Sequence, residues 1–240
     1  MLELKNIGYA VEQDGVKKTI LENVNLKINE GFVALTGPNG GGKSTLAKII
    51  AGILTPTSGE IFLNGENITA LSVTERAKKG ISFAFQQPVR FKGITVKDLI
   101  SIAKGKDISV SEACGYLSEV GLCAKDYINR EVNASLSGGE LKRIEIATVM
   151  ARGTGLSIFD EPEAGIDLWS FNNLIKVFEK LHEKIGGSII IISHQERILD
   201  IADRVVVIAD GTVLKSGSKN DILPDLLAAS SVCKTLTDKL

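Results

Sequence analysis

The segment GPNGGGKST, residues 37–45, restricts the fold of this chain more than any other stretch of its sequence. It contains four glycines, which lose more backbone entropy on folding than other residues do. It follows the apolar run FVALT (32–36) and opens KSTLAKIIAG (43–52), which has the pattern of a helix ended by Gly52. A buried strand, a glycine-rich turn and a helix in this order predict a phosphate-binding loop, because backbone N–H groups and the helix dipole converge on an anion there.

The loop matches the template GxxxxGK[ST] at its fixed positions. Lys43 is placed to reach the β- and γ-phosphates as a point charge, and Ser44 is placed to ligate Mg²⁺. Thr45 is expected to support the same phosphates. The predicted nucleotide-binding loop comprises Gly37, Pro38, Asn39, Gly40, Gly41, Gly42, Lys43, Ser44 and Thr45.

Two acidic residues, Asp160 and Glu161, follow the buried apolar run LSIF (156–159). Successive side chains diverge at the end of a strand, so the two carboxylates can do different work. We assign Asp160 to the metal ion and Glu161 to the attacking water. By itself such an acid pair is more often simply solvated.

The stretch LSGGE (136–140) has the layout of a helix capping box, with Ser137 as the cap and Glu140 three residues later. Gly138 and Gly139 are poor helix formers for a first turn, but they would expose backbone N–H groups to a second anion site. One nucleotide has little use for two such sites from one chain. A second chain that presents its 137–139 turn to the γ-phosphate would explain them.

The remaining pattern alternates strands and helices, which predicts an α/β fold with a largely parallel sheet. Residues 88–136 contain two weak helical patterns and no strong strand, so we expect a helical insertion there. Asp210-Gly211, between two strand-like runs, is a hairpin signal. The expected strands include 2–7, 20–28, 59–65 and 188–193, with EQDG (12–15) as a turn, and the other expected helices are 141–151, 169–186 and 196–203.

Composition excludes several classes of protein. The 240 residues are 44% hydrophobic and 24% charged with a net charge of −1, so no global field favours nucleic acid or an acidic membrane. Cys114, Cys123 and Cys233 have no metal-ligand spacing, which favours unpaired thiols in a reducing compartment. The N-terminus lacks a signal-peptide layout, and the longest apolar runs are too short to span a bilayer. We therefore expect a cytoplasmic protein whose membrane role, if any, depends on a partner.

With these motifs, the chain resembles the ATP-binding-cassette (ABC) ATPases over almost its whole length. The Walker A motif is GPNGGGKS, the signature is LSGGE, and LSIFDE is the Walker B motif with its glutamate. AGID (164–167) resembles the D-loop, with Asp167 as its aspartate, and IISHQ resembles the switch motif, with His194 as the γ-phosphate sensor. FAFQQP (83–88) resembles the Q-loop, whose glutamine is Gln86 or alternatively Gln87. Tyr9 falls where the family stacks an aromatic ring on adenine, although an ordinary strand tyrosine explains it almost as well.

The resemblance implies a P-loop NTPase fold with a mainly parallel core sheet, an N-terminal antiparallel β-subdomain and an inserted helical subdomain. A single domain would span 1–240, with its core in 1–87 and 151–240 and its helical part in 88–150. Two chains would sandwich two ATP molecules head to tail. Ser137, Gly138 and Gly139 of one chain would complete a site in the other chain made by Lys43, Ser44, Gln86, Asp160, Glu161 and His194. Ser44, Gln86 and Asp160 would hold Mg²⁺.

Within the family the chain is most similar to the SufC-type ATPase of SUF iron–sulfur cluster assembly. The resemblance is carried by residues 65–100, which include AFQQPV, and by LSGGELKRIEI (136–146), with Glu140, Lys142-Arg143 and Glu145. It implies a soluble scaffold protein as the partner, docked near the Q-loop. The alternatives are the ATPase subunit of a membrane transporter and a non-hydrolysing nucleotide-binding adaptor. Glu161 and His194 argue against the adaptor, which is expected to have lost one of them.

Overall fold

The structure is a computed structural model that describes residues 1–13, 15–29, 31–184, 187–226 and 228. Its chain contacts divide it into two compact units. The P-loop unit comprises Met1–Ile50, Leu54–Ala70 and Ile192–Leu240. The helical unit comprises Ala51–Ile53 and Leu71–Ile191. The predicted division into a core and a helical part at 88–150 remains a prediction.

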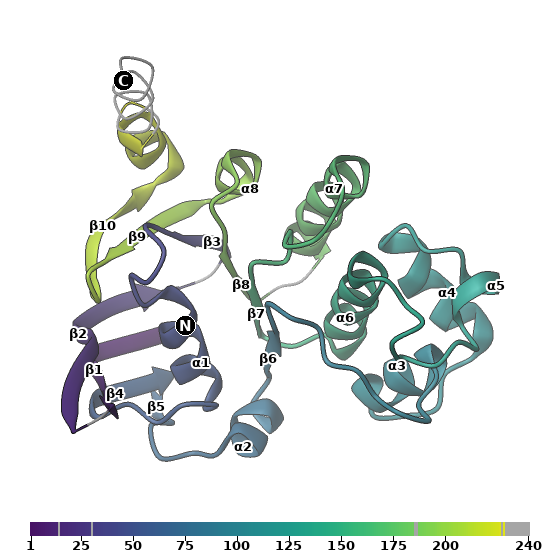
Figure 1. Ribbon diagram of the computed structural model, residues 1–240, viewed down its shortest axis with the longest axis horizontal. Helices are drawn as coiled ribbons and strands as arrows, with labels where there is room; N and C mark the ends of the chain where they lie inside the picture. The colour runs from purple at the N-terminus through teal and green to yellow at the C-terminus, as the bar shows by residue number, and fades with distance from the viewer. Residues whose placement is uncertain (14, 30, 185–186, 227, 229–240) are drawn as a thin grey trace. The chain divides into compact units, whose positions relative to one another are not determined.

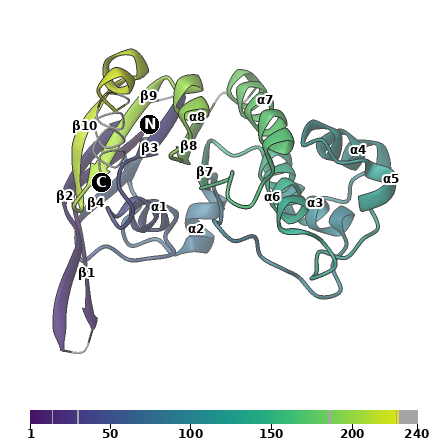
Figure 2. The same ribbon diagram turned by 45° about the horizontal axis from the view of Figure 1, so that its top comes forward.

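The P-loop unit contains an antiparallel sheet in the order β2-β1-β4-β5 and the strands β10-β9-β3 of a second sheet. Strands β3 and β9 are parallel, and β10 joins β9 as an antiparallel partner. Figure 2 shows β1 and β2 as a long hairpin. The strands are β1 (Leu2–Gln13), β2 (Val16–Ile28), β3 (Gly31–Thr36), β4 (Ser58–Leu63), β5 (Glu66–Asn67), β9 (Arg204–Ala209) and β10 (Thr212–Ser218); the helices are α1 (Lys43–Ala51) and α8 (Glu196–Ile201).

The local sequence explains these elements. Strand β3 is buried from Phe32 to Thr36, as its continuous apolar run predicts for a strand covered on both faces. Asp210 and Gly211, between β9 and β10, have φ angles of 48° and 75°. Positive φ at both central residues is the geometry of a type I′ hairpin turn, so the predicted hairpin is present.

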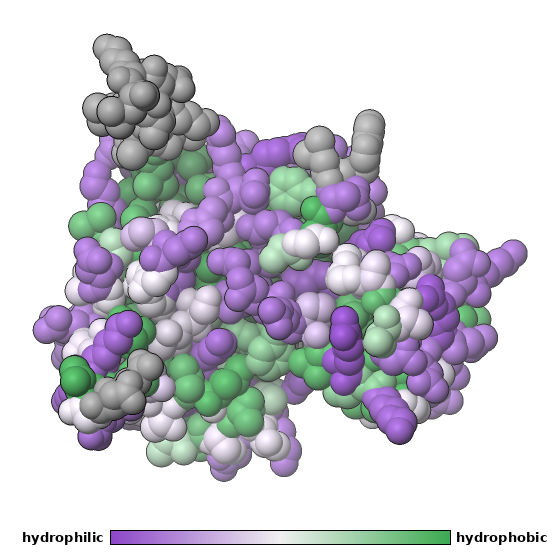
Figure 3. Space-filling view, in the orientation of Figure 1, coloured by the Kyte–Doolittle hydropathy of each residue, from purple (hydrophilic) through white to green (hydrophobic). Residues whose placement is uncertain are grey.

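The helical unit contains the strands β8-β7-β6 in that order, and β6 and β7 are parallel. Helices α3 and α4 pack against α6 (Figure 1). On the face drawn in Figure 3, hydrophilic residues cover much of the surface over α3–α5, with smaller hydrophobic patches among them. The strands are β6 (Ile81–Ala84), β7 (Leu156–Asp160) and β8 (Ser188–Ile192); the helices are α2 (Val73–Lys78), α3 (Val96–Lys104), α4 (Val110–Glu119), α5 (Ala124–Tyr127), α6 (Gly138–Arg152) and α7 (Leu168–Lys184).

The structure departs from the sequence-based expectation at several elements. Strands β1 and β2 run to Gln13 and from Val16, so the predicted turn at 12–15 is narrower, and Asp14 lies outside the described residues. The polar ends of the two strands pair with each other in the hairpin. A search for alternating apolar residues does not detect these ends, because they are mostly polar. Four short elements, β5, α2, β6 and α5, were not predicted, because two to six residues are too few to display a period.

The observed mixture of parallel strands and helices confirms the predicted α/β class. Across the described residues, none of the helices has the length and apolar character needed to cross a bilayer. Cys114 and Cys123 are free thiols, whereas Cys233 lies outside the described residues.

Candidate nucleotide site

The predicted phosphate loop of the P-loop unit connects the end of β3 at Thr36 to the start of α1 at Lys43. Gly37 has a φ of 127°, and a Cβ there would lie 2.1 Å from the carbonyl oxygen of Ile208. Gly42 has a φ of 99°, and its Cβ would lie 2.5 Å from a methyl carbon of Leu21. Both positions therefore require glycine, since any side chain would meet strained backbone and a neighbouring strand.

Lys43 lies inside this loop. The residue is 5% exposed, and its Nζ donates 2.8 Å hydrogen bonds to the carbonyl oxygens of Gly37 and Pro38. The first turn of α1 contains no acidic residue that would compete with an anion for the helix dipole. The half-buried Ser44 and Thr45 follow in the same turn. The loop thus has the charge and the backbone geometry that a phosphate chain needs.

Backbone hydrogen bonds brace the loop from the adjacent strands. Gly211 donates to the carbonyl oxygen of Gly41 at 3.2 Å, and Glu22 donates to that of Gly211 at 2.9 Å. Leu46 donates to the carbonyl oxygen of Gly42 at 2.9 Å, which joins the loop to α1. The β9–β10 turn and β2 therefore help to fix the loop in place.

Two further predicted residues belong to the P-loop unit. Tyr9 is half-buried on β1 opposite Leu21, next to an irregularity in the strand pairing. This position is compatible both with stacking on adenine and with an ordinary strand tyrosine. His194 is exposed and lies two residues after the end of β8. The preceding residue, Ser193, is buried and donates its N–H to the carbonyl oxygen of Leu35 at 3.1 Å, which fixes the backbone beside His194 against β3.

In the helical unit the structure brings Gln86 and Glu161 together. The parallel strands β6 and β7 end at the same edge, which places the residues that follow them side by side. The Nε2 of Gln86 donates to the Oε2 of Glu161 at 2.6 Å. No hydrogen bond of this kind is shown for Gln87 within the described part of the chain, so the contact favours Gln86 as the Q-loop glutamine.

Asp160 and Glu161 differ in surroundings, as the prediction of different roles requires. Asp160 is 1% exposed at the end of β7. Glu161 has a φ of 44°, which is an uncommon conformation for a residue other than glycine. Such strain is retained where the surrounding structure enforces it, and here the strained residue is the one whose carboxylate accepts the Gln86 hydrogen bond.

The LSGGE segment forms the predicted capping box at the start of α6. Glu140 N–H donates to Ser137 Oγ at 3.3 Å, and Ser137 N–H donates to Glu140 Oε2 at 2.6 Å. The hydroxyl of Tyr127 also donates to Glu140. The Tyr127 hydroxyl, followed by the Ser137 hydrogen bonds and the nearby Arg130, lowers the pKa of Glu140 to about 2. Sequence reasoning missed Tyr127, because nothing in the sequence links α5 to this cap.

The predicted metal ligands are oxygen donors: a hydroxyl on Ser44, an amide oxygen on Gln86 and a carboxylate on Asp160. These are the donors that Mg²⁺ prefers, so the residues fit the ion. Ser44 belongs to the P-loop unit, and Gln86 and Asp160 belong to the helical unit. Asp167, the predicted D-loop aspartate, is exposed just before α7, and its backbone carbonyl oxygen accepts the N–H of Phe171 at 2.8 Å.

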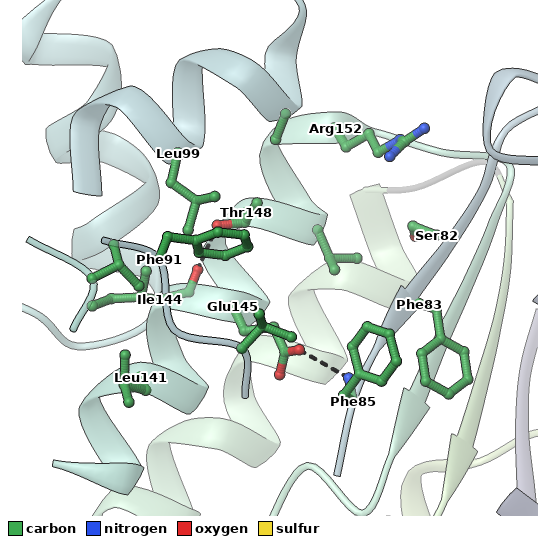
Figure 4. Close-up of a pocket in the computed structure, with 14 residues that line it drawn as sticks. Ser82, Phe83, Phe85, Phe91, Leu99, Leu141, Ile144, Glu145, Thr148 and Arg152 are labelled. Carbon is green, nitrogen blue, oxygen red and sulfur yellow. Dashed lines mark hydrogen bonds between the residues drawn. The ribbon is translucent and has the colours of Figure 1, made fainter. Parts of the chain in front are cut away.

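The helical unit also contains a pocket of about 190 Å³ that sequence reasoning did not locate. Figure 4 shows the rings of Phe83, Phe85 and Phe91 around it and the Glu145 carboxylate at one side. Most of the lining residues are apolar, and they include Leu99, Leu141 and Ile144 besides the three phenylalanines. The pocket therefore lies next to the residues that lead into Gln86.

A glycine-rich loop that clasps a buried lysine, a carboxylate pair at a strand end with an adjacent glutamine, and a glycine-rich helix start define a P-loop ATP hydrolase. The ABC transporter family model matches residues 21–164. The chain therefore belongs to the ABC transporter family of ATP-binding proteins.

Individual relatives agree with this family. The chain is 41% identical over 214 residues to an uncharacterized ABC transporter ATP-binding protein of Methanocaldococcus jannaschii, and the match covers 85% of both chains. It is 37% identical over 235 residues to the "Probable ATP-dependent transporter ycf16" of Pyropia yezoensis, with 91% of both chains covered. The structure superposes with a TM-score of 0.83 on the dimeric ATP-binding cassette MJ0796 bound to ADP and Pi, at 26% identity over 91% of this chain and 99% of the other. These likenesses confirm the predicted ABC ATPase fold and ATP as the nucleotide.

Proposed function

We propose that this ATPase is the SufC-like motor subunit of a SUF-type iron–sulfur cluster assembly complex. Two chains bind two ATP molecules head to tail, each with Mg²⁺ held by Ser44, Gln86 and Asp160. Glu161 activates the attacking water, Lys43 and His194 contact the γ-phosphate, and Tyr9 stacks on adenine. The hydrogen bond between Gln86 and Glu161 supports this arrangement, because it joins the proposed base to a proposed metal ligand.

The start of α6 supports the contribution of a second chain. A Cβ at Gly138 would meet no atom within 4 Å, and Gly138 does not have a positive φ. The fold of this chain therefore does not require glycine there, although glycine is a poorer helix former than alanine. A ligand that approaches the exposed N–H groups from outside would require it, and the γ-phosphate bound by another chain is such a ligand.

The segment that resembles SufC-type ATPases supports the choice of partner. It supplies Phe85, Val89 and Phe91 to the pocket of the helical unit. Val89 is 45% exposed, which is high for a large apolar side chain. We infer that the scaffold protein inserts an apolar side chain into this pocket, so that its docking changes the position of the neighbouring Gln86.

Affinity purification from the native host tests this proposal, with cytosol and detergent-solubilised membranes analysed separately. We expect tagged wild-type chain to recover a cytosolic protein of iron–sulfur cluster assembly. Val89→Asp should abolish that recovery, because a charge in the apolar pocket opposes docking. Val110→Asp is the matched control, since Val110 is a similarly exposed valine (58%) on α4 and does not line the pocket.

A second candidate function is that of a transporter ATPase, which the names of the two relatives favour. Recovery of a multi-span membrane protein that is lost in Val89→Asp would establish the transporter function and reject the cluster-assembly proposal. Recovery of the cytosolic partner by both valine variants would reject the pocket as its docking site.

A further inference from the structure

Helix α6 carries a pair of charged residues that are buried in the helical unit. The side chain of Lys142 is 1% exposed and that of Glu145 is 16% exposed. They are three residues apart, so they lie on the same face of the helix, and Lys142 Nζ lies 3.2 Å from Glu145 Oε2. Burial raises the pKa of Glu145, and the Lys142 charge opposes this rise.

Both members of the pair bind the backbone just before Gln86. Glu145 Oε1 accepts the N–H of Phe85 at 2.8 Å, the contact drawn in Figure 4. Lys142 Nζ donates to the carbonyl oxygen of Phe85 and lies 3.5 Å from that of Gln86. Strand β6 has ended at Ala84, so these side chains replace the strand pairing that Phe85 lacks.

Stability alone is a poor reason for such a pair. Desolvating two charges costs as much as their attraction returns, and well-packed apolar residues are often at least as stable. The distinctive result of the pair is positional: it holds Phe85 on both of its backbone polar groups. The next residue is Gln86, whose side chain donates to Glu161 at 2.6 Å.

We propose that Lys142 and Glu145 are positioning residues for ATP hydrolysis, which clamp the Phe85 peptide groups so that the Gln86 amide meets Glu161. The inference rests on the proposed roles of Gln86 and Glu161. Neither Lys142 nor Glu145 touches the nucleotide in this scheme. Their effect on catalysis passes through Gln86 alone, and this makes the inference separable from a general structural role.

The test is a double-mutant cycle on the ATPase rate of the full chain. The apolar replacement Lys142→Met with Glu145→Met should lower kcat by about ten- to a hundred-fold, the scale expected for a misplaced active-site group. The KM for ATP should change much less than kcat, because the phosphate loop that binds the nucleotide is untouched. In a Gln86→Ala background the same replacement should leave kcat where Gln86→Ala alone sets it, since there is no amide left to position.

Two comparisons keep the test interpretable. Lys142→Met with Glu145→Gln should recover part of the lost kcat, because a glutamine oxygen can still accept the Phe85 N–H. Lys180→Met with Glu119→Met removes a 2.9 Å ion pair elsewhere in the same unit and should leave kcat unchanged. Thermal unfolding of every variant is measured alongside.

Each result has a definite meaning. Losses of kcat that multiply in the Gln86→Ala background, or a double-methionine variant with wild-type kcat, would overturn the positioning role. If Gln86→Ala itself had wild-type kcat, the proposed role of Gln86 would be the part that failed. If the double-methionine variant did not fold, the test would pass to the variant Lys142→Met with Glu145→Gln. The proposal predicts partial activity for this folded variant, and full activity would reject the proposal.

Discussion

At the scale of single residues, the side chains proposed for chemistry are held by unusual local geometry. Glu161 has a φ of 44°, and its carboxylate accepts a 2.6 Å hydrogen bond from Gln86. Lys43 is buried and directed at two loop carbonyl oxygens. A lysine that is already confined loses little further entropy when a phosphate replaces one of these acceptors. Preorganisation of this kind is what a phosphate site requires.

Replacing Glu161 by glutamine tests the assignment of the general base. Glu161→Gln should bind ATP normally and lower turnover by about 10²–10⁴-fold, because an amide cannot take a proton from water. Phosphate release measures the rate, and size exclusion with ATP should reveal a trapped dimer. Glu179→Gln, an exposed glutamate on α7, is the control. An undiminished rate in Glu161→Gln would remove Glu161 from the mechanism.

At the scale of elements, helix α6 connects several parts of the helical unit. Its first turn forms the capping box, and Glu140 in that turn also accepts the Tyr127 hydroxyl from α5. Its next turn carries Lys142 and Glu145, which bind the backbone after β6. Arg143 donates to the carbonyl oxygens of Gly139 at 3.4 Å and Gly121 at 3.3 Å. The signature segment and the Q-loop are therefore attached to one helix.

The cap of α6 predicts a pH-dependent stability. Because the folded-state pKa of Glu140 is about 2 against an ordinary 4.5, its stabilisation is complete above pH 4.5 and is lost as the pH falls toward 2. Tyr127→Phe removes the largest cause of that shift. It should reduce the free energy of unfolding by about 1–2 kcal/mol near neutral pH, and the difference should narrow below pH 4.5.

Urea unfolding between pH 3 and pH 7 measures this difference. Tyr116→Phe is the matched control, because the Tyr116 hydroxyl accepts a 3.0 Å hydrogen bond from Lys104, which stays charged throughout that range. Its effect should not vary with pH. A Tyr127→Phe effect that is equally constant would show that the Glu140 contact does not exist in solution.

At the scale of the whole molecule, the proposed site is complete only when two chains meet. Ser137→Arg should abolish turnover, because the larger cation blocks the γ-phosphate of the other chain. Ser137 also caps α6, so the control must lose a cap as well. Ser109 is the N-cap of α4, and its Oγ accepts the Glu112 N–H at 3.1 Å. The control Ser109→Arg therefore also loses a helix cap, but it should retain turnover.

Mixed dimers test the head-to-tail arrangement directly. With Ser137→Arg on one chain and Glu161→Gln on the other, both changes fall in the same composite site, and the second site is left intact. With both changes on one chain, each site carries one defect. We expect ATPase activity in the first dimer and none in the second. The reverse pattern would mean that the signature serves the nucleotide of its own chain.

The sequence by itself determined the family, the α/β class and the phosphate loop, because these depend on local spacing. GPNGGGKST, LSGGE and LSIFDE act through neighbours within a few residues, and periodicity marks a strand or helix wherever enough residues display it. Only the tertiary structure brought Gln86 to Glu161, joined Tyr127 to Glu140, and buried Lys142 with Glu145 against Phe85. Those contacts depend on which strand ends and helix faces meet after folding, and no local pattern in the chain records that.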